Sequence, residues 1–311
     1  MESHPNIGHR DGAAPFRIDR GELQGERRRL GPLLGTRSIG CSHYRQGPGE
    51  RAMPVHLHAD EEELFFVTGG SGLSWQNGVT HRVCAGDLIC HRAGAEAHCL
   101  IAGPEGIEAF AFGSGSPTNM TWLPRAQAWW IGPRWIPADG PDPFSLEAAA
   151  GPLELPEPAP ADDRPPTIVN LADVRAEAFA QRGYAGREAD LGRAAGSVLS
   201  GLRHDVLEPG NVSCPPHWHT GEEELFVVLD GTGEAELGPR RFPLRPGSLV
   251  ARPPGTGVEH ALHAGPDGLT YLAYGTRVSN ELVHYPRSGK LGLGGGVFVR
   301  AQTVGYWDDE G

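Results

Sequence analysis

The chain has 311 residues, of which 39% are apolar, and it holds 45 glycines and 28 prolines. This length predicts two cores, and so many Gly and Pro residues favour short strands joined by tight turns. The net charge of 27 − 39 = −12 argues against a nucleic-acid surface, because neutralising phosphates needs clustered Arg and Lys, and the one basic cluster, Arg27 to Arg29, is short.

The start of the chain lacks the apolar segment of a secretory signal, and no stretch approaches the roughly 18 apolar residues of a membrane span. The five cysteines form no CxxC pair. These features predict a cytoplasmic protein with reduced thiols that binds neither a membrane nor nucleic acid.

A long repeat organises the chain. The stretch HLHADEEELFFVTGGSG at residues 56–72 recurs as HWHTGEEELFVVLDGTG at residues 217–233, with ten of the seventeen positions identical. The offset of 161 (217 − 56) holds without a gap over each copy and becomes 162 (260 − 98) at its last histidine. Short runs bounded by Gly or Pro fill both copies, as is typical of a β-sandwich or barrel.

The repeat predicts five parts in chain order. They are an N-terminal arm (1–30), a first barrel (31–125), a Pro/Trp-rich connector (126–165), a second barrel (166–288) and a C-terminal tail (289–311). Residues 15–23 and 166–174 are expected to be equivalent lead-in strands, at an offset of 151 (166 − 15).

Four of the seven tryptophans lie in or just before the connector, which a solvated linker rarely shows. They are Trp122, Trp129, Trp130 and Trp135. We expect residues 122–135 to pack against a barrel or across the domain interface, with a substrate-binding role as the alternative, and residues 152–165 to form a flexible tether.

Strand phase brings together the chemically active residues of each copy. Since alternate side chains of a strand share a face, His56 and His58 point to one side, and Glu63 follows in phase with its own strand. His217, His219 and Glu224 repeat this arrangement. A buried carboxylate needs a partner, and a divalent cation is the natural one.

A third imidazole for each copy is expected from His98 and His260, which follow Gly-rich turns. For any single histidine, a hydrogen bond to the backbone inside the core is the alternative. That alternative weakens for the whole set, because six of the fourteen histidines recur as two matched groups. The flanking glutamates are expected to be solvated turn residues; they are Glu61, Glu62, Glu222 and Glu223.

At these motifs the chain resembles the cupin superfamily. Its first motif, His-x-His, then Glu and then Gly, is matched by residues 56–70 and 217–231. Its second motif is matched less closely by residues 86–98 and 247–260, and Ala102 and Ala264 stand where the motif ends in Asn. The resemblance covers about residues 31–125 and 190–288. It implies an all-β fold of two tandem cupin jelly-roll β-barrels with short helices and an intervening Pro/Trp-rich connection.

The chain is more closely similar to bacterial two-domain cupins of unassigned function, which share its Tyr285 to Lys290 stretch and its Tyr306 to Asp308 signature. The superfamily resemblance implies one divalent metal ion per barrel, bound by three His and one Glu. Fe, Mn, Ni, Co and Zn all suit this mixture of nitrogen and oxygen donors.

Three classes of function remain open. The first is a metal-dependent oxygenase of the dioxygenase type that acts on a small organic molecule, and it is the main prediction. The second is a non-oxidative metalloenzyme, such as an isomerase, decarboxylase or hydrolase. The third is a non-catalytic cupin that binds or stores a metal or small ligand. The fold alone does not decide among them.

Further histidines have weaker assignments. His43 and His204 occupy equivalent strand positions and are candidates for pocket residues with an acid–base role, with a structural hydrogen bond as the alternative. His91 is expected to face solvent, and His263 to point away from the metal. Self-association as a homodimer is compatible with the duplicated barrels.

Overall fold

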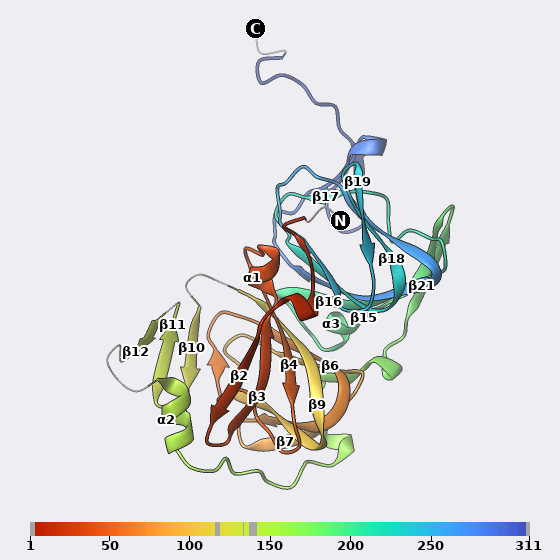
Figure 1. Ribbon diagram of the computed structural model, residues 1–311. Helices are drawn as coiled ribbons and strands as arrows, with labels where there is room; N and C mark the ends of the chain where they lie inside the picture. The colour runs from red at the N-terminus through yellow and green to blue at the C-terminus, as the bar shows by residue number, and fades with distance from the viewer. Residues whose placement is uncertain (1–3, 116–118, 133, 137–141, 309–311) are drawn as a thin grey trace.

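The computed structural model describes residues 4–115, 119–132, 134–136 and 142–308, which form two β-barrels in tandem (Figure 1). Within these residues each barrel pairs an eight-stranded sheet with a four-stranded sheet. The large sheets have the orders β13-β8-β6-β9-β4-β3-β2 and β1-β20-β18-β21-β16-β15-β14, with β7 and β19 paired to β6 and β18. The predicted all-β fold of two jelly-roll barrels is confirmed.

The first barrel contains β2 (Pro15–Arg20), β3 (Leu23–Arg29), β4 (Ile39–Gln46), β5 (Leu57–His58), β6 (Glu63–Gln76), β7 (Val79–Cys84), β8 (Asp87–His91), β9 (His98–Ser114), β10 (Met120–Leu123), β11 (Ala128–Ile131), β12 (Arg134–Ile136) and β13 (Ile168–Asn170). The second contains β1 (Ile7–His9), β14 (Glu177–Gln181), β15 (Tyr184–Asp190), β16 (Ser200–Leu207), β17 (Trp218–His219), β18 (Glu224–Leu237), β19 (Arg240–Leu244), β20 (Ser248–Arg252), β21 (His260–Thr276), β22 (Val283–Tyr285), β23 (Lys290–Gly292) and β24 (Phe298–Arg300). The helices are short: α1 (Gly31–Leu34), α2 (Pro143–Ala149) and α3 (Leu191–Ala194), with 3₁₀ turns at residues 10–12, 161–163, 171–173 and 286–288.

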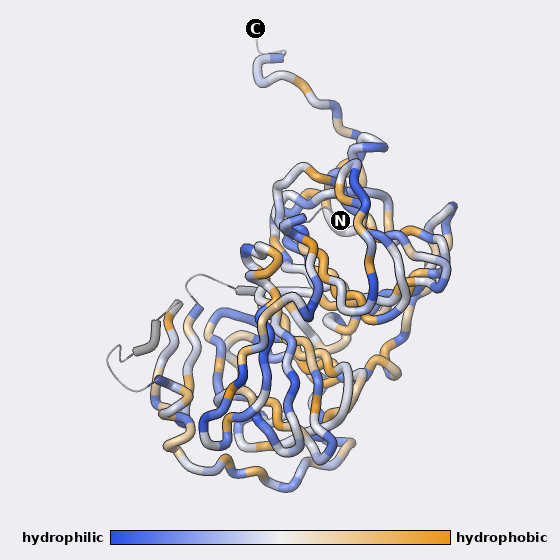
Figure 2. Tube along the Cα trace, viewed as in Figure 1, coloured by the Kyte–Doolittle hydropathy of each residue, from blue (hydrophilic) through white to orange (hydrophobic). Residues whose placement is uncertain are grey.

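The central strands are apolar on both faces because both faces are buried. On β6, Phe65 and Val67 point into the first barrel, whereas Leu64 and Phe66 point out of it into a core shared by the two barrels. The shared core includes Phe112 and Tyr274, whose rings stack at 5.0 Å. Figure 2 shows apolar residues along the strands where the two barrels meet.

The glycines that close the first cupin-like motif allow a bulge in the long strands. Gly70 has a φ of 74°, and a Cβ atom there would lie 2.2 Å from the carbonyl oxygen of Gly106. Gly231 repeats this with a φ of 77° and a distance of 2.3 Å to Gly268. The pairing of β6 with β9 and of β18 with β21 shifts register beside these residues. Only Gly tolerates both the backbone angle and the close approach.

The two barrels exchange their first strands. β1 pairs with β20 of the second barrel, and β13, which precedes the second barrel in sequence, pairs with β8 of the first. In Figure 1 the start of the described chain accordingly lies beside the second barrel. The equivalence predicted for residues 15–23 and 166–174 is therefore wrong. The structural equivalent of β13 is β1, at the same offset of 161 (168 − 7) as the rest of the repeat. Strands of three residues carry too little pattern to fix their alignment.

Two buried carboxylates join the barrels at the same junction. Glu62 is 0% exposed and accepts hydrogen bonds from the second barrel, from the amides of Val198 and Leu199 at 2.9 and 3.4 Å and from two serine hydroxyls. Glu223 is also 0% exposed and accepts from the amides of residues 37–39 and from the Ser38 hydroxyl, at 2.6–3.1 Å.

The expectation that Glu62 and Glu223 are solvated is thus wrong. Each is in phase with the outward apolar residues of its strand, so it follows them into the interface between the barrels. Four donors surround each carboxylate and replace the water that it loses on burial.

The connector is docked on the first barrel. Glu147 of α2 is 0% exposed and pairs with Arg51 at 2.8 Å and Arg125 at 3.1 Å. Residues 154–164 then follow the barrel surface, where Glu154 and Pro156 accept hydrogen bonds from Trp75 and Thr80. The indole rings of Trp122 and Trp129 contact each other, with 4.9 Å between their centres. Trp129 and Trp130 are also partly open to solvent, with 40% and 37% of each residue exposed. The side chain of Trp135 lies outside the described residues.

In the described part of the chain, no helix has the length and apolar character to cross a membrane.

Substitution Glu62→Ala should lower the free energy of unfolding by about 3–5 kcal/mol, because several buried donors of the second barrel lose their acceptor. Urea unfolding followed by tryptophan fluorescence measures this. The control Glu157→Ala, at an exposed position, should stay within about 0.5 kcal/mol of the unaltered chain. Equal stability of the two variants would contradict a role for Glu62 at the interface.

Candidate metal centres

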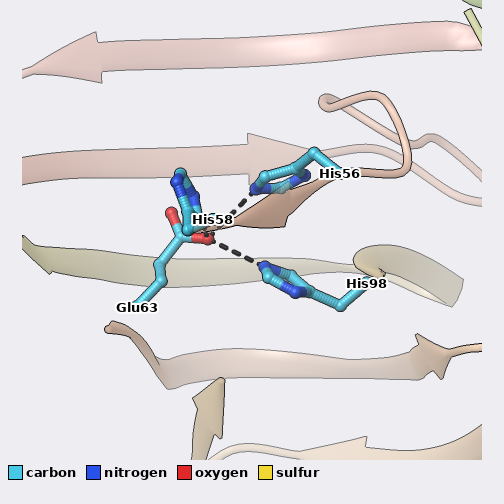
Figure 3. A group of neighbouring side chains, drawn as sticks. All are labelled: His56, His58, Glu63 and His98. Atoms are coloured by element: carbon cyan, nitrogen blue, oxygen red, sulfur yellow. Dashed lines mark hydrogen bonds and ion pairs between the residues drawn. The ribbon is translucent and has the colours of Figure 1, made fainter. Parts of the chain in front are cut away.

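The first barrel brings together three imidazoles and one carboxylate. Figure 3 shows His56, His58 and His98 directed at the carboxylate of Glu63. The Nε2 atoms of the three histidines lie 3.2, 3.5 and 3.1 Å from Glu63 Oε2. His56 and His58 come from the segment leading through β5, Glu63 opens β6, and His98 opens β9 beside His56. The four ligand atoms all lie within 4.8 Å of one another.

The second barrel repeats the cluster with His217, His219, Glu224 and His260. Glu224 Oε2 lies 3.2 Å from His219 Nε2 and 2.9 Å from His260 Nε2. The Nε2 atoms of His217 and His219 are 3.0 Å apart. The structure thus brings together all eight residues that the sequence proposed as metal ligands, four in each barrel.

The other nitrogen of most of these imidazoles is held by the protein. His56 Nδ1 lies 2.9 Å from the Pro54 carbonyl oxygen, and His98 Nδ1 lies 3.1 Å from that of Glu96. His217 Nδ1 lies 3.0 Å from the Pro215 carbonyl oxygen. A carbonyl oxygen only accepts, so Nδ1 carries the proton and Nε2 keeps its lone pair for a ligand.

In each cluster, side chains rather than a backbone carbonyl oxygen hold the Nδ1 atom of one further imidazole. His58 Nδ1 lies 3.1 Å from Thr121 Oγ1 and 3.5 Å from Glu61 Oε2. His219 Nδ1 lies 3.2 Å from Glu281 Oε1, and backbone amides 220–222 donate to the same carboxylate. Sequence reasoning missed Thr121 and Glu281, which lie about sixty residues from their histidines with no repeat to mark them. Glu61, expected in solvent, is largely buried, and this burial raises its pKa.

The buried donor atoms fit a divalent cation. His58 Nε2, Glu224 Oε2 and His260 Nε2 are buried without a hydrogen-bond partner among the described residues, although the last two lie only 2.9 Å apart. Their orientation therefore suits a shared ligand better than a bond to each other. Burial would raise the pKa of Glu63, but the three histidines around it outweigh burial and hold that pKa well below its usual value. One divalent metal ion in each barrel, as predicted, fits both donor sets.

His91 is buried, and the expectation that it faces solvent is wrong. Its ring stacks on that of His98 at 3.7 Å, and its Nδ1 lies 2.7 Å from Glu96 Oε1. Burial lowers the pKa of His91 to about 3. β8 is buried on both faces, so His91, in phase with Ile89, points into the barrel. In the second barrel Arg252 takes its place.

His43 and His204 lie away from both metal clusters. His43 is next to Tyr44, which faces the first barrel's interior, so it points to the opposite side. There its Nε2 lies 3.0 Å from Glu108 Oε1, and its ring contacts Phe110. His204 contacts Phe66 of the shared core. The structure does not bring these histidines to a substrate pocket, and the structural alternative describes His43. His263 bonds to Glu236 at 2.6 Å, away from the cluster.

A cavity of about 110 Å³ opens onto the first cluster. His56, His58 and Glu63 form one wall. The other walls come from β2, β3, β4, the segment before β5, β10, β11 and α2, and are mainly apolar. The first metal centre is therefore accessible to a small molecule.

Comparisons with known proteins agree with this architecture. Residues 42–109 and 203–272 each match the family described as Cupin domain. No curated protein matches the sequence. Among solved structures, the formate complex of Lactobacillus farciminis oxalate decarboxylase has a TM-score of 0.60 at 18% identity, with 90% of this chain and 88% of that chain covered.

A deletion mutant of Bacillus subtilis oxalate decarboxylase has a TM-score of 0.62 at 18% identity, covering 88% of this chain and 77% of that one. A structure reported for the Mn(II) centres of the B. subtilis enzyme has a TM-score of 0.60 at 16% identity, covering 90% and 79%. At such identities the likeness shows the fold.

The chain should bind two divalent ions, and Glu63→Ala and Glu224→Ala should each leave one. Removing one carboxylate leaves three neutral imidazoles, which hold a divalent ion more weakly. Elemental analysis of untagged protein gives the stoichiometry, with Glu157→Ala as the control that keeps two ions. Chelation should also lower the melting temperature, since an ion at 100 times its Kd stabilises by about 2.7 kcal/mol. Two ions in both ligand variants would contradict the assignment.

Metal binding to the second centre should release a proton near neutral pH. Burial lowers the pKa of His219, but Glu224 and then Glu281 outweigh burial and raise it to about 9. In the metal-free protein, this protonated imidazole stabilises the fold below its usual pKa of 6.5, and the contribution is lost as pH rises through 9. A metal needs the neutral imidazole, so affinity should rise about tenfold per pH unit across that window.

Calorimetry in buffers of different ionisation enthalpy measures the released proton. In Glu281→Gln the proton release at pH 7.5 should fall, because one of the charges that raises the pKa of His219 is gone. An unchanged release in this variant would show that Glu281 does not set the protonation of His219.

Proposed function

We propose that this chain, a bicupin with one cupin domain in each barrel, is a metal-dependent enzyme that decarboxylates a small organic acid without net oxidation. Complete donor sets in both barrels, on a fold shared with oxalate decarboxylases over at least 88% of the chain, carry this proposal. The same likeness favours the non-oxidative alternative over the oxygenase that the sequence first suggested.

The ligands of the first ion would be His56, His58, Glu63 and His98, and those of the second would be the equivalent four residues of the other barrel. A bound divalent ion would polarise a substrate carboxylate and stabilise developing negative charge. Mn(II) is the first ion to test, because it is the metal named for the B. subtilis relative.

The protein's own residues orient the ligands and limit access of water. Carbonyl oxygens and Thr121 fix the imidazoles, so little reorganisation accompanies ligand binding. The apolar walls of the cavity exclude bulk water and strengthen electrostatic interactions inside it.

Decarboxylation also balances without an added oxidant. The C–C bond to the carboxyl group breaks, CO2 leaves, and the electron pair left on carbon takes up a proton. The complete donor sets of both barrels count against a storage role that needs no metal. We infer a cytoplasmic enzyme with a small-molecule substrate, and the homodimer expected from the sequence stays a prediction.

The Mn(II)-loaded chain should release CO2 from one or more members of a panel of small mono- and dicarboxylic acids, with no net uptake of O2. Glu63→Ala should lower kcat/KM by about 100-fold or more, because the loss of metal polarisation removes several kcal/mol of transition-state stabilisation. A CO2 assay and an oxygen electrode make the two measurements. O2 uptake equal to substrate consumed would establish an oxygenase, and an inert chain with two bound ions would establish a binding protein.

A further inference from the structure

The duplication offers an internal comparison of the two metal centres. Three strands that run side by side, β2, β3 and β4, place Phe16, Arg27 and Tyr44 in one row across the first barrel. All three line the cavity that holds the first metal cluster. Arg27 therefore brings a positive charge to this cavity. It belongs to the short basic cluster Arg27 to Arg29.

The guanidinium of Arg27 is held in place and keeps donors free. Its Nε atom donates to Ser42 Oγ at 3.0 Å, and its planar group lies 5.3 Å from the centre of the Tyr44 ring. No carboxylate of a described residue pairs with it, whereas neighbouring Arg28 pairs with Glu26 at 3.1 Å. The two Nη groups are thus available to a planar anion, which a guanidinium binds through paired hydrogen bonds.

The second barrel carries the opposite charge at the matched positions. Glu177, Glu188 and Asp205 form its equivalent row across β14, β15 and β16. Arg203 replaces Ser42 and lies 3.5 Å from Asp205 and 3.9 Å from Glu188, so its charge is compensated. Arg252, nearer the second cluster, is 4% exposed and donates to the Val258 carbonyl oxygen. A row of three acids beside one paired Arg does not attract an anion.

The remaining walls of the first cavity indicate what the anion carries. Ile18, Met53, Leu123 and Phe144 contribute apolar surface, and Phe16, which is 62% exposed, stands at the mouth with Trp130. A second carboxylate placed against these side chains would lose its hydration with no donor to replace it. The cavity of about 110 Å³ limits the ligand to a few carbon atoms.

From these observations we propose that the first barrel is the substrate-binding barrel, that Arg27 anchors the carboxylate of a short monocarboxylic acid there, and that the second centre takes no such ligand. This rests on the proposed function only in taking the first cluster as a metal centre. Arg27 acts here as a specificity-determining residue, and the acid's alkyl chain packs against the apolar walls.

Calorimetric titration of the Mn(II)-loaded chain with butyrate tests the proposal directly. One butyrate should bind per chain. Arg27→Gln should weaken the Kd about 10- to 100-fold, as expected for the loss of a charge-assisted hydrogen-bond pair. Arg27→Lys keeps the charge but lacks the paired N–H donors of the guanidinium, so its Kd should lie between those of the unaltered chain and Arg27→Gln. Arg29→Gln removes the same charge from an exposed residue of the same strand and should leave the Kd unchanged.

Two further comparisons test the role of the ligand's charge and show which barrel binds it. Binding of uncharged butyramide should be weak and insensitive to Arg27→Gln. Glu63→Ala should abolish butyrate binding, whereas Glu224→Ala should retain it. Two ions per chain in the Arg27 variants, measured by elemental analysis, show that the barrels are intact. Two equal butyrate sites, a Kd within twofold in Arg27→Gln, or loss of binding in Glu224→Ala alone would overturn the proposal.

Failure of the Arg27 proposal can be distinguished from failure of the proposed decarboxylase function. If butyrate binding depends on Arg27 but no acid loses CO2, the anion site stands and the decarboxylase fails. If acids are decarboxylated and Arg27→Gln leaves KM unchanged, the decarboxylase stands and the role of Arg27 fails.

Discussion

The structure depends on two consecutive glutamates that point in opposite directions from the start of one strand. Glu63 turns into its barrel and meets three imidazoles, while Glu62 turns outward and accepts hydrogen bonds from the other barrel. Glu224 and Glu223 repeat this on the other side. Because the alternation of a strand is rigid, the geometry of each metal centre is tied to the docking of the two barrels. A barrel separated from its partner would expose to water both this carboxylate, which lies next to a metal ligand, and the apolar residues in phase with it.

This mutual capping explains why the duplicated halves have kept the same central strand while their outer strands diverged. The run Glu-Glu-Leu-Phe at residues 62–65 serves the metal with one face and the interface with the other, so neither face is free to change. The strands β2 and β3 cover the cavity and take part in neither task. There the first barrel carries Phe16 and Arg27 where the second carries Glu177 and Glu188. This part of the divergence falls on walls that a ligand would meet.

The metal clusters could be predicted from the sequence because their information is local. Two histidines and a glutamate within eight residues have their directions set by strand phase, and the repeat identifies the third histidine of each set. Glu62, His91 and Glu281 were missed for different physical reasons. Glu62 lies in a run of charged residues, which suggested a solvent-exposed turn. The apolar residues on both faces of β6 nevertheless indicated that both faces of this strand are buried. His91 lies on β8, which is covered by β13, the strand exchanged between the barrels. Glu281 contacts His219 although the two residues are sixty-two positions apart in the sequence (281 − 219). The exchange of β1 and β13 depends on the packing of whole barrels, which no short stretch records.

The contrast between the barrels also bears on what the second metal centre contributes. Its ligand His219 is held by Glu281, a carboxylate that accepts from three consecutive backbone amides and so fixes the loop between β17 and β18. That loop carries Glu223, which caps residues 37–39 at the beginning of β4. β4 in turn supplies Ser42 and Tyr44, the two residues that hold Arg27 in the first cavity. Hydrogen bonds and short stretches of backbone therefore link the second centre, through Glu281 and Glu223, to the strand against which Arg27 is placed. On this view the second centre contributes to the way the two barrels dock, whereas the first cavity alone supplies the residues that bind the anion.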